Sequence, residues 1–320
     1  MIKQANELTF GDKKFSMILY GAPGVGKTTL ALSAPNPVLI DFDKGVSRVK
    51  AYHRRLTIVC DTYEEVLNDI QAPEIKDCET IIIDTGGSFV SYLQDYVMRE
   101  NPAVNKQKNG AISLKGFGAV KQEFQRFTNM VRDVMNKNVI YVFHSDEQKD
   151  KDGNPQQRLL CEGAARNIVW QPCDFGGYVQ MIGNTRVVTF TPTQEFFAKG
   201  CYGIEGQFNV PSIGPADKNE FLTNLFEKAR ANIEADNEAF APLKEQYDAA
   251  MIEVRKILDN IKTVDDANAA VASLPSLNHA LTSKKEASAL LSEKAKELGF
   301  AWDKTSKGYI VPAAESVGAN

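Results

Sequence analysis

The chain has 320 residues, of which 43% are hydrophobic and 24% charged, a composition typical of a soluble globular protein with one large and one smaller domain. Its formal net charge of −4 excludes a global basic field, so any binding of nucleic acid must be local. No apolar stretch has the length of a membrane span or of a signal-peptide core, and the five cysteines form no C-x-x-C pair. We therefore expect a cytoplasmic protein with reduced thiols and no membrane partner.

The first motif follows an apolar run from Phe15 to Tyr20, which predicts a buried strand. Directly after it comes a full match to the phosphate-binding motif G-x-x-x-x-G-K-[ST], and then a helical segment. The glycines allow backbone N–H groups to turn towards phosphate oxygens, the lysine reaches the β- and γ-phosphates, and the next hydroxyl holds Mg²⁺. The predicted nucleotide-binding residues are Gly21, Ala22, Pro23, Gly24, Val25, Gly26, Lys27, Thr28 and Thr29.

The predicted nucleotide is ATP with Mg²⁺. Guanine-specific P-loop proteins carry an N-K-x-D element, which this sequence does not contain. A second apolar run, residues 80–83, predicts another strand that ends at Asp84. A carboxylate at a strand end beside the P-loop holds Mg²⁺ directly or through water, so we expect Asp84 and Thr28 to form the metal site.

The stretch VLIDFDKG, residues 38–45, places Asp41 and Asp43 at the end of a third predicted strand. On a strand the two carboxylates would point to the same side. ATP hydrolysis needs a group that orients or deprotonates water, and Thr85 stands where many ATPases have a Glu after the strand-end Asp. We therefore expect Asp43 to be the catalytic carboxylate and Asp41 to be structural. The alternative is a solvated strand end that leads into a turn.

Together, the P-loop and the two strand ends resemble those of the RecA-like ATPases. More narrowly they are similar to the phage-encoded RecA/Rad-like ATPases of the phage nucleotide-binding protein family, several of which are single-strand annealing recombinases. The resemblance covers roughly residues 10–230. It implies an α/β fold: a RecA-like core with a mostly parallel central sheet flanked by helices, plus a small C-terminal helical extension. It also implies Asp43 as the catalytic carboxylate, although the recombinases usually carry the longer Glu.

The same resemblance assigns catalytic roles to Lys27 and to two further residues. His144, at the end of a strand predicted over residues 138–143, stands at the position of a γ-phosphate sensor; a satisfied structural histidine is the alternative. Lys199 matches the lysine of an element that caps ATP bound to a neighbouring subunit, although Cys201 stands at the arginine position of that element. A solvated surface lysine is the alternative there. The resemblance thus implies a homo-oligomer with ATP at subunit interfaces.

Residues 99–118 lack periodicity and predict a long loop. Lys106, Lys108 and Lys115 make this loop basic, and a basic flexible loop can contact the phosphates of single-stranded DNA. A mobile loop that is merely soluble is the alternative. Residues 145–163 form a second candidate for DNA contact, in which acidic side chains offset the basic ones.

We divide the chain into a RecA-like ATPase domain, residues 1–235, and a C-terminal helical domain, residues 236–320. The sequence EADNEAFAP at the boundary indicates a linker. The second domain has helical segments with capping boxes at Thr263 and Ser283, a hairpin-like tail and no catalytic motif. Its expected role is oligomerisation, partner binding or a helical buttress on the ATPase core.

The resulting hypothesis is an ATP-hydrolysing protein that acts on single-stranded DNA in recombination, annealing or repair, in a phage-infected or prophage-carrying bacterium. The alternative is an ATP switch with little hydrolysis that assembles with a phage single-strand-binding or replication protein. A small-molecule kinase is disfavoured because no arginine-rich lid follows the P-loop.

Overall fold

The computed structural model describes residues 12–161 and 169–312. Within these ranges the chain divides into two compact units, one up to residue 232 and one from residue 233. None of the described helices combines the length and apolar character that a membrane crossing requires.

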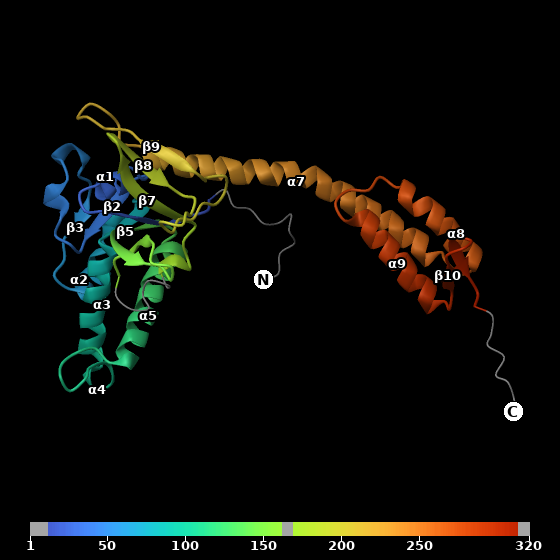
Figure 1. The fold of residues 1–320 in the computed structure, drawn as a ribbon, viewed down its shortest axis with the longest axis horizontal. Helices are drawn as coiled ribbons and strands as arrows, with labels where there is room; N and C mark the ends of the chain where they lie inside the picture. The colour runs from blue at the N-terminus through green and yellow to red at the C-terminus, as the bar shows by residue number, and fades with distance from the viewer. Residues whose placement is uncertain (1–11, 162–168, 313–320) are drawn as a thin grey trace. The chain divides into compact units, whose positions relative to one another are not determined.

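The first unit is built on one mixed sheet (Figure 1). Within the described residues this sheet has nine strands, in the order β3-β2-β4-β5-β1-β7-β8-β9, with β6 paired to β5 outside this path. The strands from β3 to β7 in that order are parallel, whereas β6, β8 and β9 are antiparallel to their neighbours. Their bounds are β1 Ser16–Gly21, β2 Pro37–Asp41, β3 Thr57–Ile58, β4 Thr80–Asp84, β5 Asn138–Lys149, β6 Pro155–Leu159, β7 Phe175–Ile182, β8 Thr185–Thr189 and β9 Gln207–Val210.

Helices or helical turns connect the successive strands from β1 to β5, because parallel neighbours need crossover connections. The predicted α/β class with a mostly parallel central sheet is confirmed, and it is consistent with a RecA-like P-loop core followed by C-terminal helices. The helices and helical turns of the first unit are α1 Lys27–Ala31, η2 Val46–Arg48, η3 Ala51–His53, α2 Tyr63–Asp69, η4 Pro73–Ile75, α3 Gly86–Glu100, α4 Pro102–Asn105, α5 Leu114–Asn129 and the π-helical turn η5 Met130–Val134.

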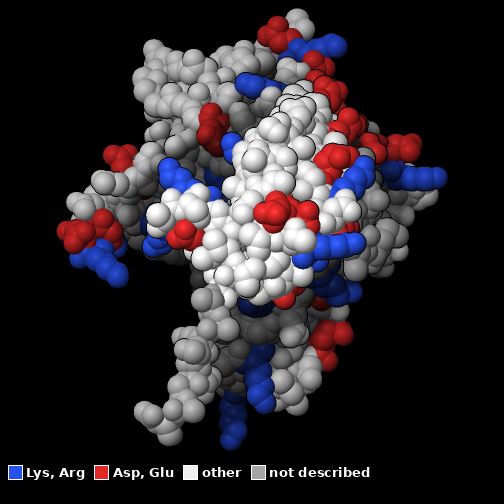
Figure 2. Space-filling view, turned by 90° about the vertical axis from the view of Figure 1, so that its right-hand side faces the viewer, with Lys and Arg blue, Asp and Glu red and all other residues white. Residues whose placement is uncertain are grey.

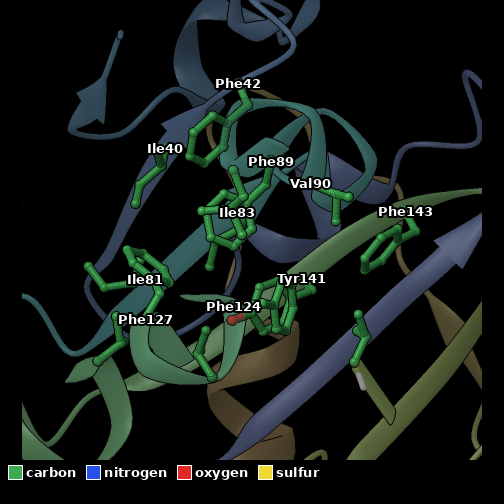
Figure 3. Packing of buried hydrophobic residues seen from close by; sticks show 14 of the residues in the cluster. Ile40, Phe42, Ile81, Ile83, Phe89, Val90, Phe124, Phe127, Tyr141 and Phe143 are labelled. Carbon is green, nitrogen blue, oxygen red and sulfur yellow. The ribbon is translucent and has the colours of Figure 1, made fainter. Parts of the chain in front are cut away.

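The core lies between the sheet and the helices α2, α3 and α5 (Figure 3). The central strands are apolar and buried on both faces, as expected for a parallel sheet covered on both sides. Phe89 of α3 and Phe124 of α5 pack against each other and against Tyr141 of β5, with ring centroids 5.1–6.5 Å apart. These aromatic contacts fix the helices on the sheet and thereby hold the strand ends that carry polar residues.

One local prediction for this unit was wrong. The segment over residues 99–118 is not a structureless loop, because α4 occupies its first part and α5 begins at Leu114 behind the N-cap Ser113. The apolar side chains in the middle of α5 are buried, whereas Phe117 near its start is 39% exposed and Val134, beyond its end, is 79% exposed. Strands β7 and β8 form an antiparallel hairpin that turns at Gly183-Asn184.

The second unit contains the later part of a long helix and a small helical bundle. Its elements are α7 Phe221–Asp259, α8 Val264–Ser273, η6 Leu274–Ser276, α9 Ser283–Glu297, β10 Ala301–Asp303 and β11 Gly308–Ile310. The core of this unit is small and aliphatic, with Val254, Leu291 and Tyr309 among its buried members.

The sequence at residues 234–242 is helical, so the predicted linker is wrong. Alanine and glutamate are strong helix formers, and Pro242 lies inside α7 without ending it. The capping box at Thr263 is confirmed, whereas α9 is preceded by Thr282, which makes no side-chain capping bond. Ser283 is the first residue of α9 and not its N-cap; its hydroxyl oxygen accepts from the N–H of Ala280 and donates to the carbonyl of the same residue.

Candidate nucleotide site

Residues from four neighbouring strands lie together at one edge of the sheet, the edge at which the parallel strands end. Strand β1 ends at Gly21, β2 at Asp41 and β4 at Asp84, while β5 passes this edge at His144. The register places Asp41 beside Asp84 and Gly21 beside His144. In parallel sheets the carboxyl ends of the strands form the ligand crevice, so this edge is where a bound molecule is expected.

The loop after β1 folds around the side chain of Lys27. Its amino group donates to the carbonyl oxygens of Gly21, at 2.9 Å, and Ala22, at 2.8 Å. Gly26 has φ 88 and forms the N-cap of α1, a left-handed conformation that glycine adopts without steric cost. The loop therefore has the shape that directs successive backbone N–H groups inward around an anion.

A cavity of about 450 Å³ opens in front of this loop. Of the residues predicted for the site, it is lined by Pro23, Gly24, Gly26, Lys27, Thr28, Thr29, Asp43, Asp84 and His144. The other members of the motif, Gly21, Ala22 and Val25, contribute backbone to the loop without lining the cavity.

Thr28 and Asp84 are joined by a hydrogen bond in which the hydroxyl donates to the carboxylate at 2.6 Å. The pKa of Asp84 is raised to about 6, chiefly by burial and with a contribution from the Asp41 and Asp43 charges, while the Thr28 hydrogen bond and the Lys27 charge act in the opposite direction. The described residues contain no cluster of three or more His, Cys, Asp or Glu side chains that could hold a metal. A hydroxyl and one carboxylate fit Mg²⁺, which takes its remaining ligands from phosphates and water.

Lys27 is buried, with 5% of its surface exposed. Burial lowers the pKa of its amino group to about 8, although the Asp84 charge opposes this. His144 lies against it, with Nδ1 at 3.4 Å from the lysine nitrogen, and burial and the Lys27 charge lower the pKa of this histidine. Strand β5 does not end at His144 as predicted; it continues to Lys149 because it pairs with β6.

The two carboxylates of VLIDFDKG have different environments. Asp41 is buried and accepts hydrogen bonds from the backbone N–H groups of Gly45, at 2.8 Å, and Val46, at 2.9 Å. Strand β2 ends at Asp41, so Asp43 lies in the following turn and the two side chains do not share a strand face as predicted. Asp43 lines the cavity and is paired with Arg48 at 2.5 Å. Asp41 therefore fixes the turn, and Asp43 faces the ligand space.

The structure does not bring the other predicted residues to this cavity. The amino group of Lys199 donates to the carbonyl oxygen of Cys173 at 2.5 Å within the same chain. Lys106, Lys108 and Lys115 are exposed around the connection from α4 to α5. In Figure 1 this connection lies at the ends of α3 and α5 farther from α1.

The second candidate for DNA contact, residues 145–163, forms a hairpin over its described part. Strands β5 and β6 are joined by a turn held by the Asp150 carboxylate, which accepts from the N–H groups of Asp152 and Asn154. Residues 162 and 163 of the predicted segment lie outside the described residues.

Several basic residues near the cavity were not predicted. Arg48 lines it, and an adjoining pocket of about 310 Å³ is lined by Arg48, Lys50, His53 and Arg186. The Nε atom of Arg186 donates to the carbonyl oxygen of Val25 at 2.6 Å. The basic stretch from residue 48 to residue 55 was a usable sequence signal, whereas Arg186 is 161 positions from Val25 and only the fold places it there.

Comparisons with known proteins identify the type of domain that contains this site. No curated protein matches the chain. The flagellar accessory protein FlaH from Methanocaldococcus jannaschii is a similar solved structure, with 9% identity over 55% of this chain and 76% of its own and a TM-score of 0.28, which is too low to carry an argument. The model of the AAA domain matches residues 13–202, more than half of the chain. The chain therefore belongs to the AAA-domain family of P-loop ATPase-like proteins, which supports nucleotide binding.

Proposed function

We propose that the protein binds ATP with Mg²⁺ and hydrolyses it, and that it uses this cycle to act on single-stranded DNA. The observation that carries the ATP assignment is the meeting of Lys27, Thr28 and Asp84 in one cavity beside a glycine-rich loop. These residue types in this arrangement bind the phosphates and the metal ion of a nucleoside triphosphate.

The buried charges of Lys27 and Asp84 would each gain a partner of opposite charge from bound nucleotide and metal. The charged forms of Lys27 and Asp84 are both disfavoured by burial, and phosphate oxygens beside the lysine would offset this cost. Lys27 would exchange the carbonyl oxygens of Gly21 and Ala22 for the β- and γ-phosphates. Thr28 and Asp84 would hold Mg²⁺, which neutralises developing charge on the phosphates when bound.

Hydrolysis also requires a group that accepts or orients the proton of the attacking water. Asp43 is the side chain we assign to this task, because it lines the cavity and Asp41 is already bound to backbone N–H groups. His144 lies on the Lys27 side of the same cavity, which supports a role in sensing the terminal phosphate.

One observation favours a second function, an ATP switch with little hydrolysis. Thr85 follows Asp84, so no Glu is present beside the metal site, and Asp43 is engaged by Arg48. In this alternative, ATP would stabilise one conformation for assembly with a replication or single-strand-binding protein. Single-turnover measurement of phosphate release separates the two, since only the enzyme converts bound ATP.

The role on single-stranded DNA is supported by a local group of exposed lysines, Lys106, Lys108 and Lys115. On the face seen in Figure 2, Lys and Arg are interspersed with Asp and Glu, and the formal net charge of the chain is −4, so the proposed DNA contact is assigned to these lysines alone. The same proposal includes a phage origin and a role in recombination or annealing. It also includes a homo-oligomer in which Lys199 reaches the ATP of a neighbouring subunit.

The test of the ATP assignment is Lys27→Ala, compared with Lys121→Ala on the exposed side of α5 as the matched control. We expect Lys27→Ala to abolish tight binding of a fluorescent ATP analogue and phosphate release, because the cation on the phosphates is lost. Lys121→Ala should retain both, with circular dichroism showing that both variants fold. Normal binding and turnover in folded Lys27→Ala would refute the P-loop assignment, and stimulation of turnover by single-stranded DNA would support the proposed target.

A further inference from the structure

The turn after β2 brings a second charged residue to the nucleotide cavity. The Asp41 carboxylate holds the N–H groups of Gly45 and Val46, and η2 then places Arg48 back over the turn. One guanidinium nitrogen of Arg48 lies 2.5 Å from the Asp43 carboxylate. The buried Asp41 carboxylate thus fixes the turn in which the partly exposed Asp43 carboxylate pairs with Arg48.

Gly45 leaves room for this pair. A Cβ atom added there would lie 2.2 Å from a guanidinium nitrogen of Arg48 and 2.9 Å from its Cζ. The φ of Gly45 is −99, a value that any residue adopts, so the backbone conformation does not require glycine, and a larger side chain there would displace the Arg48 guanidinium. The Arg48 side chain thus passes directly over Gly45, where the absence of a Cβ leaves space for it.

Arg48 has access to more than Asp43. It lines the cavity that contains Lys27 and Thr28, and it also lines the adjoining pocket beside Arg186. Its side chain is 69% exposed, and that of Asp43 is 35% exposed, so water screens their attraction and the pair is weak. A phosphate group, with more charge and bidentate oxygen geometry, is a stronger partner for a guanidinium than one screened carboxylate.

We propose that Arg48 is a positioning residue that senses the terminal phosphate of ATP. In the nucleotide-free protein Arg48 holds Asp43. When ATP binds, the guanidinium moves from Asp43 to the γ-phosphate, and the Asp43 carboxylate is freed for the attacking water. The water oxygen then bonds to the γ-phosphorus, its proton passes to Asp43, and the bond from phosphorus to the β–γ bridging oxygen breaks, so that ADP leaves with the electron pair.

This inference rests on the proposed ATP hydrolysis. It adds that the terminal phosphate of ATP itself frees the catalytic carboxylate. ADP lacks the terminal phosphate and would leave the Asp43–Arg48 pair in place. The exchange therefore predicts that Arg48 contributes to the affinity for ATP and not to the affinity for ADP. A purely structural role of Arg48 in the turn would affect both nucleotides equally.

The experiment measures dissociation constants for ATP and ADP by calorimetry in the full chain and in two variants. Arg48→Gln should weaken ATP binding about tenfold, the value of one lost hydrogen bond to a charged group, and change ADP binding less than about twofold. Lys44→Gln is the matched control: Lys44 belongs to the same turn but pairs with Asp61 and does not line the cavity. It should change neither constant.

A second variant tests the exchange itself. Asp43→Asn should increase the preference for ATP over ADP, because Arg48 no longer has to leave a carboxylate. The same substitution made on the Arg48→Gln background should give a smaller increase, since only direct repulsion between Asp43 and the phosphates is then relieved.

The outcomes separate this inference from the proposed function. Equal weakening of ATP and ADP in Arg48→Gln, or an equal or larger effect of Asp43→Asn on the Arg48→Gln background, would overturn the exchange while ATP binding stands. If the unmodified protein binds neither nucleotide, the proposed function itself is wrong.

Discussion

Asp84 and Lys27 show at the residue scale how a ligand site reduces stability. Both are buried with the charged form disfavoured, and among the described residues neither forms a salt bridge: Asp84 accepts from a hydroxyl, and Lys27 donates to two carbonyl oxygens. Uncompensated burial of charge costs free energy. The folded protein therefore contains two groups that bound nucleotide and metal would stabilise.

The first prediction concerns the pH dependence of stability. The pKa of Asp84 is about 6 in the folded protein against an ordinary value of 3.8. Between these values the folded protein keeps a proton that the unfolded chain releases, so the free energy of unfolding falls as pH rises from about 4 to 6. Asp84→Asn removes this titration, while its side-chain oxygen can still accept from Thr28.

We therefore expect the stability of Asp84→Asn relative to the unmodified protein to increase by up to about 3 kcal/mol between pH 4 and pH 7. Urea unfolding of both proteins without nucleotide at pH 4.5, 5.5 and 7 measures this difference. A difference that stays constant across the range would show that Asp84 is ionised throughout.

The second prediction orders three carboxylates by role. Asp43→Asn should retain ATP and Mg²⁺ binding and lose turnover by about 10²–10⁴-fold, the range for a lost general base. Asp41→Asn should mainly lower stability, by about 1–3 kcal/mol, because an amide offers one acceptor oxygen to two backbone N–H groups. Asp84→Asn should weaken binding that depends on Mg²⁺. Nucleotide titrations and phosphate-release rates distinguish the three, and an inactive Asp41→Asn beside a fully active Asp43→Asn would reverse our assignment.

At the scale of elements, α5 anchors the sheet edge through its central aromatic residues. Phe124 is 2% exposed and its ring centroid lies 5.1 Å from that of Tyr141 on β5, the strand that carries His144. Phe117, about two turns earlier on the same helix, is 39% exposed. Two phenylalanines of the same helix thus differ sharply in the exposed fraction of their side chains.

The third prediction uses this contrast. Phe124→Ala should lower the free energy of unfolding by about 3–5 kcal/mol, since it removes a buried ring and leaves a cavity. Phe117→Ala, the matched control, should cost much less because water already reaches that ring. Chemical denaturation measures both, and similar losses for the two variants would contradict the burial seen along α5.

At the scale of the whole molecule, a net charge of −4 means that the proposed DNA binding would depend on local groups of basic residues. The fold separates the exposed lysines of the α4–α5 connection from the nucleotide cavity, so ATP and DNA would not compete for the same cations. An effect of DNA on turnover would then have to pass through α3 or α5 to the strand ends.

The fourth prediction tests these lysines as phosphate contacts. Replacing Lys106, Lys108 and Lys115 together by Gln should lower the slope of log affinity against log salt by about 0.7 for each lost contact with single-stranded DNA. The control replaces Lys284, Lys285 and Lys296, three lysines of α9 in the second unit, by Gln. Filter binding at several salt concentrations gives the slopes. An unchanged slope in the first triple variant would move the DNA site elsewhere, with residues 145–161 next to be tested.

The sequence by itself determined the features that depend on neighbouring residues. The strand, glycine-rich loop and helix around Gly21–Thr28 follow from apolar patterning and from the backbone freedom of glycine, both of which act within a few positions. The strand that ends at Asp84 follows in the same way from its β-branched run. Local propensity also misled: Pro242 and its neighbours predicted a linker, and only the continuous helix α7 shows that strong helix formers prevail there.

The tertiary structure alone decided which distant side chains meet. The register of β2, β4, β5 and β1 brings Asp84 to Thr28 and His144 to Lys27, and the antiparallel β8 delivers Arg186 to the P-loop. It also separated Asp41 from Asp43, because the strand ends between them and the turn buries one carboxylate and exposes the other. Contacts such as these depend on strand order and burial, to which residues far apart in the chain contribute together, so no local pattern can specify them.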